Sequence, residues 1–158
     1  MEKIFKILVI ASALSLSAHS MGGETYYGGG LTAMDVSGGY TDRTLGTIHG
    51  LVGYRFNEYY AAETRLGTTI NDNNPRVEKF GGFYLKGGRH VSETIYPYAI
   101  VGYTIGSFNG SSDSAPSYGA GVAFSMIYDV KLNLEYISYL NKDGAEFLGF
   151  SLGFSKPF

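Results

Sequence analysis

Five charged residues that follow a two-residue period are the first candidates for chemistry in this chain. Arg55, Glu63 and Arg65 lie in one stretch of the sequence, and Lys131 and Glu135 lie in another. Residues of one parity point to the same face of a β-strand, so each stretch is expected to turn its charges to a single face. Cations and carboxylates on an enclosed face can neutralise one another. The set therefore predicts an interior charge network that acts either as a narrow path for ions or as a structural plug.

A second candidate is the segment Gly149-Phe150-Ser151-Leu152-Gly153, which matches the G-x-S-x-G pattern around the nucleophilic serine of many hydrolases. That chemistry needs a sharp turn from a strand into a helix and a histidine that acts as the base. Only five residues follow Gly153, the strand pattern continues on both sides, and no histidine follows. We therefore expect no catalytic residue in this segment.

Metal and cofactor sites are not expected either. His49 and His90 are the two histidines that follow Ser20, and no local spacing brings them to one metal ion. His49 is predicted to face the interior and His90 to lie in a turn. Asn109-Gly110-Ser111 matches a glycosylation sequon, but Asn-Gly is also the commonest pair in tight turns, and a turn is the preferred interpretation.

The composition excludes several classes of protein. The chain has 158 residues, no cysteine, and a formal net charge of -2 from 12 basic and 14 acidic side chains. One domain is expected, and nucleic acid is not expected as a partner, because there is no basic excess to contact phosphates. The lack of cysteine excludes disulfides, thiolate metal sites and cysteine nucleophiles.

The segment from Met1 to Ser20 is expected to form a signal peptide for export. Lys3 and Lys6 supply the positive start, an apolar run follows, and Ala18-His19-Ser20 provides a cleavage site of small residues. The apolar run is shorter than the roughly 20 residues that a membrane helix needs. The predicted organisation is therefore a signal peptide over residues 1–20 and one domain over residues 21–158.

The rest of the sequence alternates between apolar residues and small or polar ones, as β-strands do. Leu148, Phe150 and Leu152, for example, alternate with Gly149 and Ser151, and no long window keeps a helical spacing. Eight such runs predict strands at about 24–34, 45–56, 59–68, 77–86, 94–106, 118–127, 130–139 and 145–156. Short turns alternate with longer polar loops, which are expected at Asp35 to Thr44, Thr69 to Arg76, Ser107 to Ser117 and Leu140 to Gly144.

An even number of strands of about ten residues, with tight turns at one rim and polar loops at the other, is typical of a transmembrane β-barrel. A soluble sandwich or lipocalin-like barrel would also alternate, but its apolar side chains would point inward. The strand face opposite the apolar one carries charged residues and glycines. These residues favour the membrane barrel, because they suit a narrow polar interior. We therefore predict an all-β, eight-stranded antiparallel up-and-down transmembrane β-barrel. Its lipid-facing residues are expected to include Val52, Tyr54, Leu134, Phe150 and Leu152.

Short motifs rich in Tyr, Gly and Phe recur in a fixed order along the chain. They are Tyr26-Tyr27-Gly28-Gly29-Gly30, Gly53-Tyr54-Arg55-Phe56-Asn57, Pro97-Tyr98-Ala99, Tyr118-Gly119-Ala120-Gly121-Val122, Leu134-Glu135-Tyr136 and the terminal Phe158. In their order and spacing the chain resembles the small eight-stranded outer-membrane proteins, which include the OmpA transmembrane domain, OmpX and the neisserial opacity proteins. The resemblance covers almost the whole chain after Ser20.

The resemblance implies a place in the cell outer membrane, with both ends of the exported chain in the periplasm. It implies a non-enzymatic protein that is anchored in lipid and presents four surface loops for adhesion, interaction or envelope integrity. The partners that it implies are outer-membrane lipid, the barrel-assembly machinery and a surface ligand of unknown kind. It also implies that the aromatic last strand carries an assembly signal, at Phe154 and Phe158, although Lys156-Pro157 stands where a hydrophobic residue is usual.

Two other functions remain as alternatives, a narrow pore for ions or small solutes and a lipid-modifying barrel enzyme. The plug is preferred to the pore because eight strands enclose only enough space for side chains. The enzyme is disfavoured because the sequence offers no histidine together with a serine or carboxylate at one rim.

Overall fold

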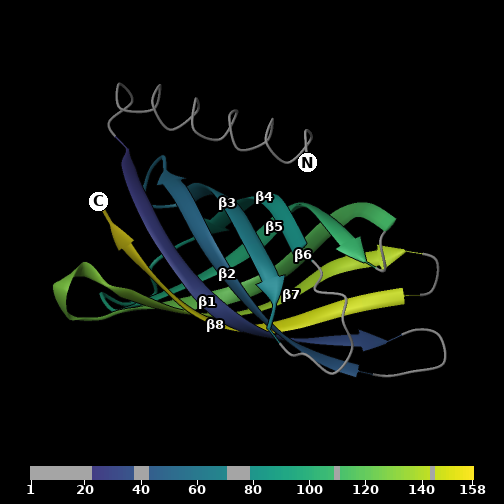
Figure 1. Cartoon of the computed structure of the whole chain (residues 1–158). Helices are drawn as coiled ribbons and strands as arrows, with labels where there is room; N and C mark the ends of the chain where they lie inside the picture. Colours follow the sequence, from purple (N-terminus) through teal and green to yellow (C-terminus); the bar gives the residue numbers. More distant parts are fainter. Residues whose placement is uncertain (1–22, 38–42, 71–78, 109–110, 143–144) are drawn as a thin grey trace.

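The computed structural model of the chain describes residues 23–37, 43–70, 79–108, 111–142 and 145–158. The predicted signal peptide over residues 1–20 and the sequon at Asn109 lie outside these residues. Eight strands form a closed barrel in which each strand is antiparallel to both neighbours and β1 pairs with β8 (Figure 1). The strands are β1 (Glu24–Ser37), β2 (Arg43–Arg55), β3 (Tyr60–Thr69), β4 (Lys79–Gly88), β5 (Ile95–Phe108), β6 (Ser111–Ser125), β7 (Lys131–Lys142) and β8 (Ala145–Pro157). The predicted fold class is confirmed.

The two ends of the barrel differ, and they are named here by their connections. At the turn end, β2 joins β3, β4 joins β5 and β6 joins β7 through short segments. Both Gly23 and Phe158 lie at this end, where the amide of Phe158 donates a hydrogen bond to the carbonyl of Thr25 at 3.0 Å. The opposite end is the loop end.

The turn between β6 and β7 has an unusual backbone. Tyr128 and Asp129 both have a φ of 60°, and the amide of Val130 donates to the carbonyl of Ile127 at 3.5 Å. Two left-handed residues in the middle of a tight turn match the type I′ geometry of β-hairpins, in which Asn and Gly are the favoured residues. Tyr128 carries no such preference and is 81% exposed.

Two predicted loops are wrong. The expected loop from Ser107 to Ser117 belongs largely to β5 and β6, which pair as far as Phe108 and Ser111. The expected loop from Leu140 to Gly144 likewise belongs mostly to β7 and β8, which pair as far as Lys142 and Ala145. Polar sequences form strand here because backbone groups make the ladder whatever the side chains are.

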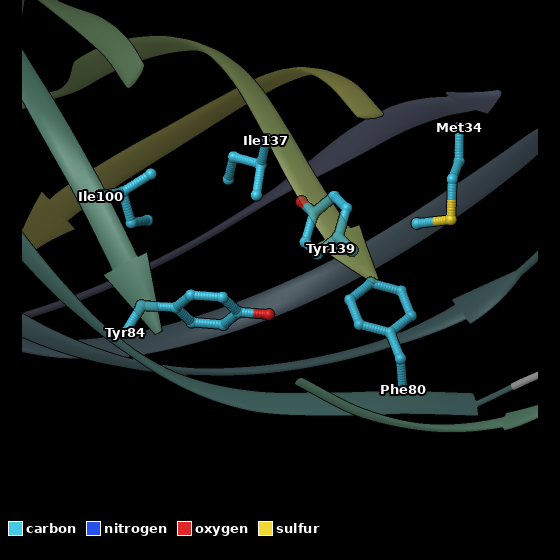
Figure 2. Close-up of a cluster of buried hydrophobic side chains, with 6 residues drawn as sticks. All are labelled: Met34, Phe80, Tyr84, Ile100, Ile137 and Tyr139. Carbon is cyan, nitrogen blue, oxygen red and sulfur yellow. The ribbon is translucent and has the colours of Figure 1, made fainter. Parts of the chain in front are cut away.

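An apolar layer fills the half of the interior nearer the loop end. Figure 2 shows six buried side chains from four strands that point toward one another: Met34, Phe80, Tyr84, Ile100, Ile137 and Tyr139. A register shift between Ser138 and Leu140 marks a bulge in β7, and Tyr139 lies within it and packs its ring 5.8 Å from that of Phe80. These six side chains therefore form an apolar cluster inside the barrel.

The outward face carries large apolar side chains, as a lipid-facing wall requires. Val52, Phe150 and Leu152 are exposed and Leu134 is half-buried. Tyr54 differs from its expected exposure, because its hydroxyl accepts a hydrogen bond from the amide of Gly23 and its ring contacts Phe56 at 5.2 Å. Only 9% of Tyr54 is exposed, against 47% of Val52.

Within the described residues, no helix has both the length and the apolar character needed to cross a membrane.

Candidate functional site inside the barrel

Arg65 of β3 is the centre of a buried ion network. Its guanidinium donates to one carboxylate oxygen of Glu63 at 2.5 and 2.9 Å, and to both oxygens of Glu135 at 2.5 and 2.8 Å. Arg65 and Glu63 are each 1% exposed. Two fork-like contacts of this kind use the planar geometry that distinguishes arginine from lysine. One guanidinium therefore holds two carboxylates that come from different sides of the barrel.

Lys86 of β4 is a fourth member of the network and was not predicted from the sequence pattern. Its ammonium lies 3.0 Å from Glu63 and 3.6 Å from Glu135, and 3.9 Å from the centre of the Tyr98 ring. The signal was present in the sequence, since Lys86 shares the parity of Phe80 and Tyr84 in one strand. It was missed because it stands at the predicted end of that strand, where an exposed lysine is common.

Two tyrosines, Tyr26 and Tyr98, complete the network, because each donates a hydrogen bond from its hydroxyl to one of the carboxylates. Tyr26 on β1 pairs with Gly53 on β2, and Gly53 pairs with Glu63 on β3. The Tyr26 side chain crosses over Gly53, and its hydroxyl donates to Glu63 at 2.8 Å. A Cβ on Gly53 would lie 2.6 Å from that hydroxyl oxygen, so only glycine leaves room for the crossing.

The second row repeats the first on the other side of the barrel. Tyr98 on β5 pairs with Gly121 on β6, which pairs with Glu135 on β7. The Tyr98 hydroxyl donates to Glu135 at 2.6 Å, and a Cβ on Gly121 would lie 2.7 Å from the Tyr98 ring. Each carboxylate thus receives a tyrosine hydroxyl as well as the cations, so its buried oxygens are hydrogen-bonded.

Arg55 and Lys131 were expected in the network but lie outside it, at the turn end. Arg55 pairs with Glu24 at 2.8 Å in a partly exposed contact, and its guanidinium lies 5.4 Å from the centre of the Tyr26 ring. The pairing of Gly53 with Glu63 follows the expected register, but Arg55 turns toward the first strand and away from Glu63. Lys131 has no ion pair to any described residue.

The serine of the G-x-S-x-G segment lies inside the barrel. Ser151 is buried in the middle of β8, and its hydroxyl is 2.5 Å from that of Thr32, which lies 3.4 Å from Nδ1 of His49. The strand continues through Ser151 without the turn that a nucleophile elbow requires. His90 packs its ring 4.9 Å from Tyr96 instead. Among the described residues, no group of three or more His, Cys, Asp or Glu is placed to hold a metal ion.

The network is suited to closing the barrel. In a closed ring of eight strands, β3 and β7 lie opposite each other, and the contact from Arg65 to Glu135 joins them directly. Removing one partner from a buried ion pair typically costs about 3–5 kcal/mol, since the other charge is left without compensation. The network therefore joins opposite walls of the barrel through Glu63, Arg65 and Glu135, each of which makes several hydrogen bonds.

Comparison with known proteins gives matches to one family model and to solved barrels. The family model described as outer membrane protein beta-barrel domain matches residues 7–158. No curated protein sequence matches the chain.

Several solved structures share the fold, among them the following three. Neisserial surface protein A superposes with a TM-score of 0.69 at 15% identity, over 87% of this chain and 99% of that one. Ail, the attachment invasion locus protein of Yersinia pestis, gives 0.62 at 18% identity, over 86% and 99%. The N-terminal β-barrel domain of Pseudomonas aeruginosa OprF gives 0.55 at 12% identity, over 84% and 98%.

Proposed function

Because the chain belongs to the outer membrane protein β-barrel family, and so is a protein of the outer membrane, we propose that it is a closed, non-enzymatic barrel that presents its loop end at the cell surface for adhesion. In this arrangement the turn end and both chain ends face the periplasm. The segment from Met1 to Ser20 directs export and is removed. The last strand, with Phe154 and Phe158, is read by the barrel-assembly machinery.

The observation that carries this proposal is the length of the strands at the loop end. About 9–11 residues suffice for a tilted strand to cross a bilayer. β5 has 14 residues and β6 has 15, and they remain paired through the polar stretch from Gly106 to Asp113. The two strands have more residues than the membrane requires, and a paired polar ribbon is a suitable element for contact with another surface.

The contacts inside the barrel support a structural role in preference to a pore function. The contact from Arg65 to Glu135 spans the barrel, and the apolar layer lies on its loop side. Ions would have to displace hydrogen-bonded charges to pass. The buried position of Ser151 in a continuous strand likewise supports a role without catalysis.

The test compares two variants in a Gram-negative strain that adheres weakly to cultured epithelial cells. In one, residues 107–112 are replaced by Asn-Gly, which shortens the β5–β6 hairpin without entering the apolar wall. The other carries Tyr128→Asn and Asp129→Gly, which change the turn at the opposite end. The wild type and the turn variant are expected to raise adherence several-fold, and the shortened hairpin is expected to lose most of that gain.

Outer-membrane fractionation establishes that all three proteins are present in equal amounts. Adherence that does not exceed that of the empty strain would contradict the adhesion role. Large, reproducible conductance of the purified protein in planar bilayers would contradict the closed interior and favour the pore.

A further inference from the structure

A second polar site lies at the turn end, beside the buried network. Here a small hollow of about 20 Å³, partly open to solvent, is lined by three cationic side chains, Arg55, Lys86 and Lys131. Tyr98 and Asn133 also line it, and none of its described lining residues is acidic. A hollow with cations on its wall and no carboxylate is suited to an anion.

The charges around the hollow do not balance. Among the described residues that form the hollow, the network and their direct ion pairs, four Arg and Lys side chains face three Glu side chains. Glu63 and Glu135 are shared by Arg65 and Lys86, and Glu24 pairs with Arg55. Lys131 is the cation that remains, half-buried and without an ion pair to any described residue.

The remaining donors at the site point to an oxyanion. Arg55 uses one terminal nitrogen, Nη1, for Glu24, and a guanidinium has five N–H donors in a planar fork. The Lys131 ammonium supplies three more donors, and ammonium and guanidinium together are a common set for phosphate and carboxylate oxygens. Asn133 is held beside them by a hydrogen bond from its amide nitrogen to Ser155 at 3.1 Å.

We propose that this turn-end hollow, between Lys131 and Arg55, is a binding site for one oxyanion group, a phosphate or a carboxylate. The bound group supplies the negative charge that the interior lacks, and it reaches the site from the turn end, where Arg55 and Lys131 are only half-buried. The site is independent of the adhesion proposed for the loop end.

The experiment uses the full barrel refolded in a maltoside detergent, which carries no phosphate or carboxylate. Sodium phosphate, sodium acetate and sodium chloride are titrated separately at constant ionic strength, and backbone NMR shifts at residues 131, 133 and 155 report binding. Saturable shifts are expected with phosphate or acetate and not with chloride. The phosphate and acetate arms show which oxyanion the site prefers.

Lys131→Gln is expected to weaken the affinity at least tenfold, since it removes the uncompensated cation. The matched control is Lys156→Gln, which removes an exposed lysine at the same end of the barrel and should leave the affinity within twofold. Arg55→Gln provides a second variant on the other side of the hollow and is also expected to weaken binding. Equal affinity in Lys131→Gln and wild type, or shifts with chloride that match those with phosphate, would overturn the proposal.

Discussion

Arg65 and Glu135 are 70 positions apart in the sequence and lie on opposite strands of the barrel, yet they form two hydrogen bonds of 2.5 and 2.8 Å. Neighbouring strands are already joined by backbone ladders, so a side-chain contact between them adds little to the shape of the barrel. A contact across the ring is different, because it fixes the distance between walls that no backbone hydrogen bond joins.

Arg65→Met is therefore expected to lower the free energy of unfolding by about 3–5 kcal/mol, because Glu63 and Glu135 lose the guanidinium that they share. Urea titration in lipid vesicles measures the loss. The control is Glu24→Gln, which removes a partly exposed pair with Arg55 and should cost less than about 1 kcal/mol. Similar losses in the two variants would show that the central network does not stabilise the barrel.

Gly53→Ala is expected to lower the free energy of unfolding by about 1–3 kcal/mol, because the new Cβ would push Tyr26 off its path to Glu63. Gly50→Ala in the same strand is the matched control, since a Cβ there would meet its nearest atom only at 4.0 Å. The same urea titration compares the two. In a Tyr26→Ala background the penalty at position 53 should disappear, and its persistence would assign the cost to backbone strain.

Leu152→Arg is expected to cost about 2–4 kcal/mol in vesicles, because it places a charge on the lipid-facing wall. Ile127→Arg introduces the same charge in an exposed turn and should change stability by less than about 0.5 kcal/mol. Refolding yield and unfolding by urea give both values. An unchanged free energy of unfolding in Leu152→Arg would mean that this face of β8 does not contact lipid.

The turn from Ile127 to Val130 can be improved. The double change Tyr128→Asn and Asp129→Gly should raise the free energy of unfolding by about 1 kcal/mol, because the new residues adopt a positive φ with less strain. Tyr128→Ala retains a Cβ in the same conformation and should bring no gain in the urea titration. Stabilisation by the alanine variant would indicate that exposure of the tyrosine, and not the backbone, is the unfavourable feature.

Deletion of Phe158 separates folding from assembly. Its ring is exposed and lies 4.9 Å from that of Tyr27, so refolding in detergent should be almost unchanged. The amount delivered to the outer membrane of living cells should fall, if the terminal aromatic residue is recognised during assembly. Full delivery without Phe158 would show that it carries no signal in this protein.

The sequence was sufficient for the fold, because alternation, strand count and turn spacing are local patterns that survive in the barrel. It also placed Glu63, Arg65 and Glu135 on inward-facing positions. Which cation meets which carboxylate could not be predicted, because that depends on how far each side chain reaches across the ring. Arg55 shows this most clearly, since its register was read correctly but its ion pair is with Glu24 on the other adjacent strand.

The limits of the loops were missed for a different reason. Ser, Asn and Asp are usual in loops, and the stretch from Ser107 to Ser117 is rich in them. Its described residues nevertheless continue the ladders of β5 and β6 beyond the apolar part of the wall. A polar composition indicates that a segment is exposed to solvent. It does not determine whether the backbone of that segment pairs with a neighbouring strand.

The two Tyr-Gly-Glu rows give the interior an approximate two-fold symmetry. Tyr26 and Glu63 are 37 positions apart, and so are Tyr98 and Glu135, so strands β5 to β7 reproduce the arrangement of β1 to β3. Arg65 breaks this symmetry, because the residue that stands two positions after Glu135, as Arg65 stands two positions after Glu63, is Ile137. A second arginine there would bring two guanidinium groups together in the narrow interior. A single arginine between the two equivalent carboxylates avoids that repulsion, so the asymmetry of the sequence allows the symmetric pair of rows to share one guanidinium.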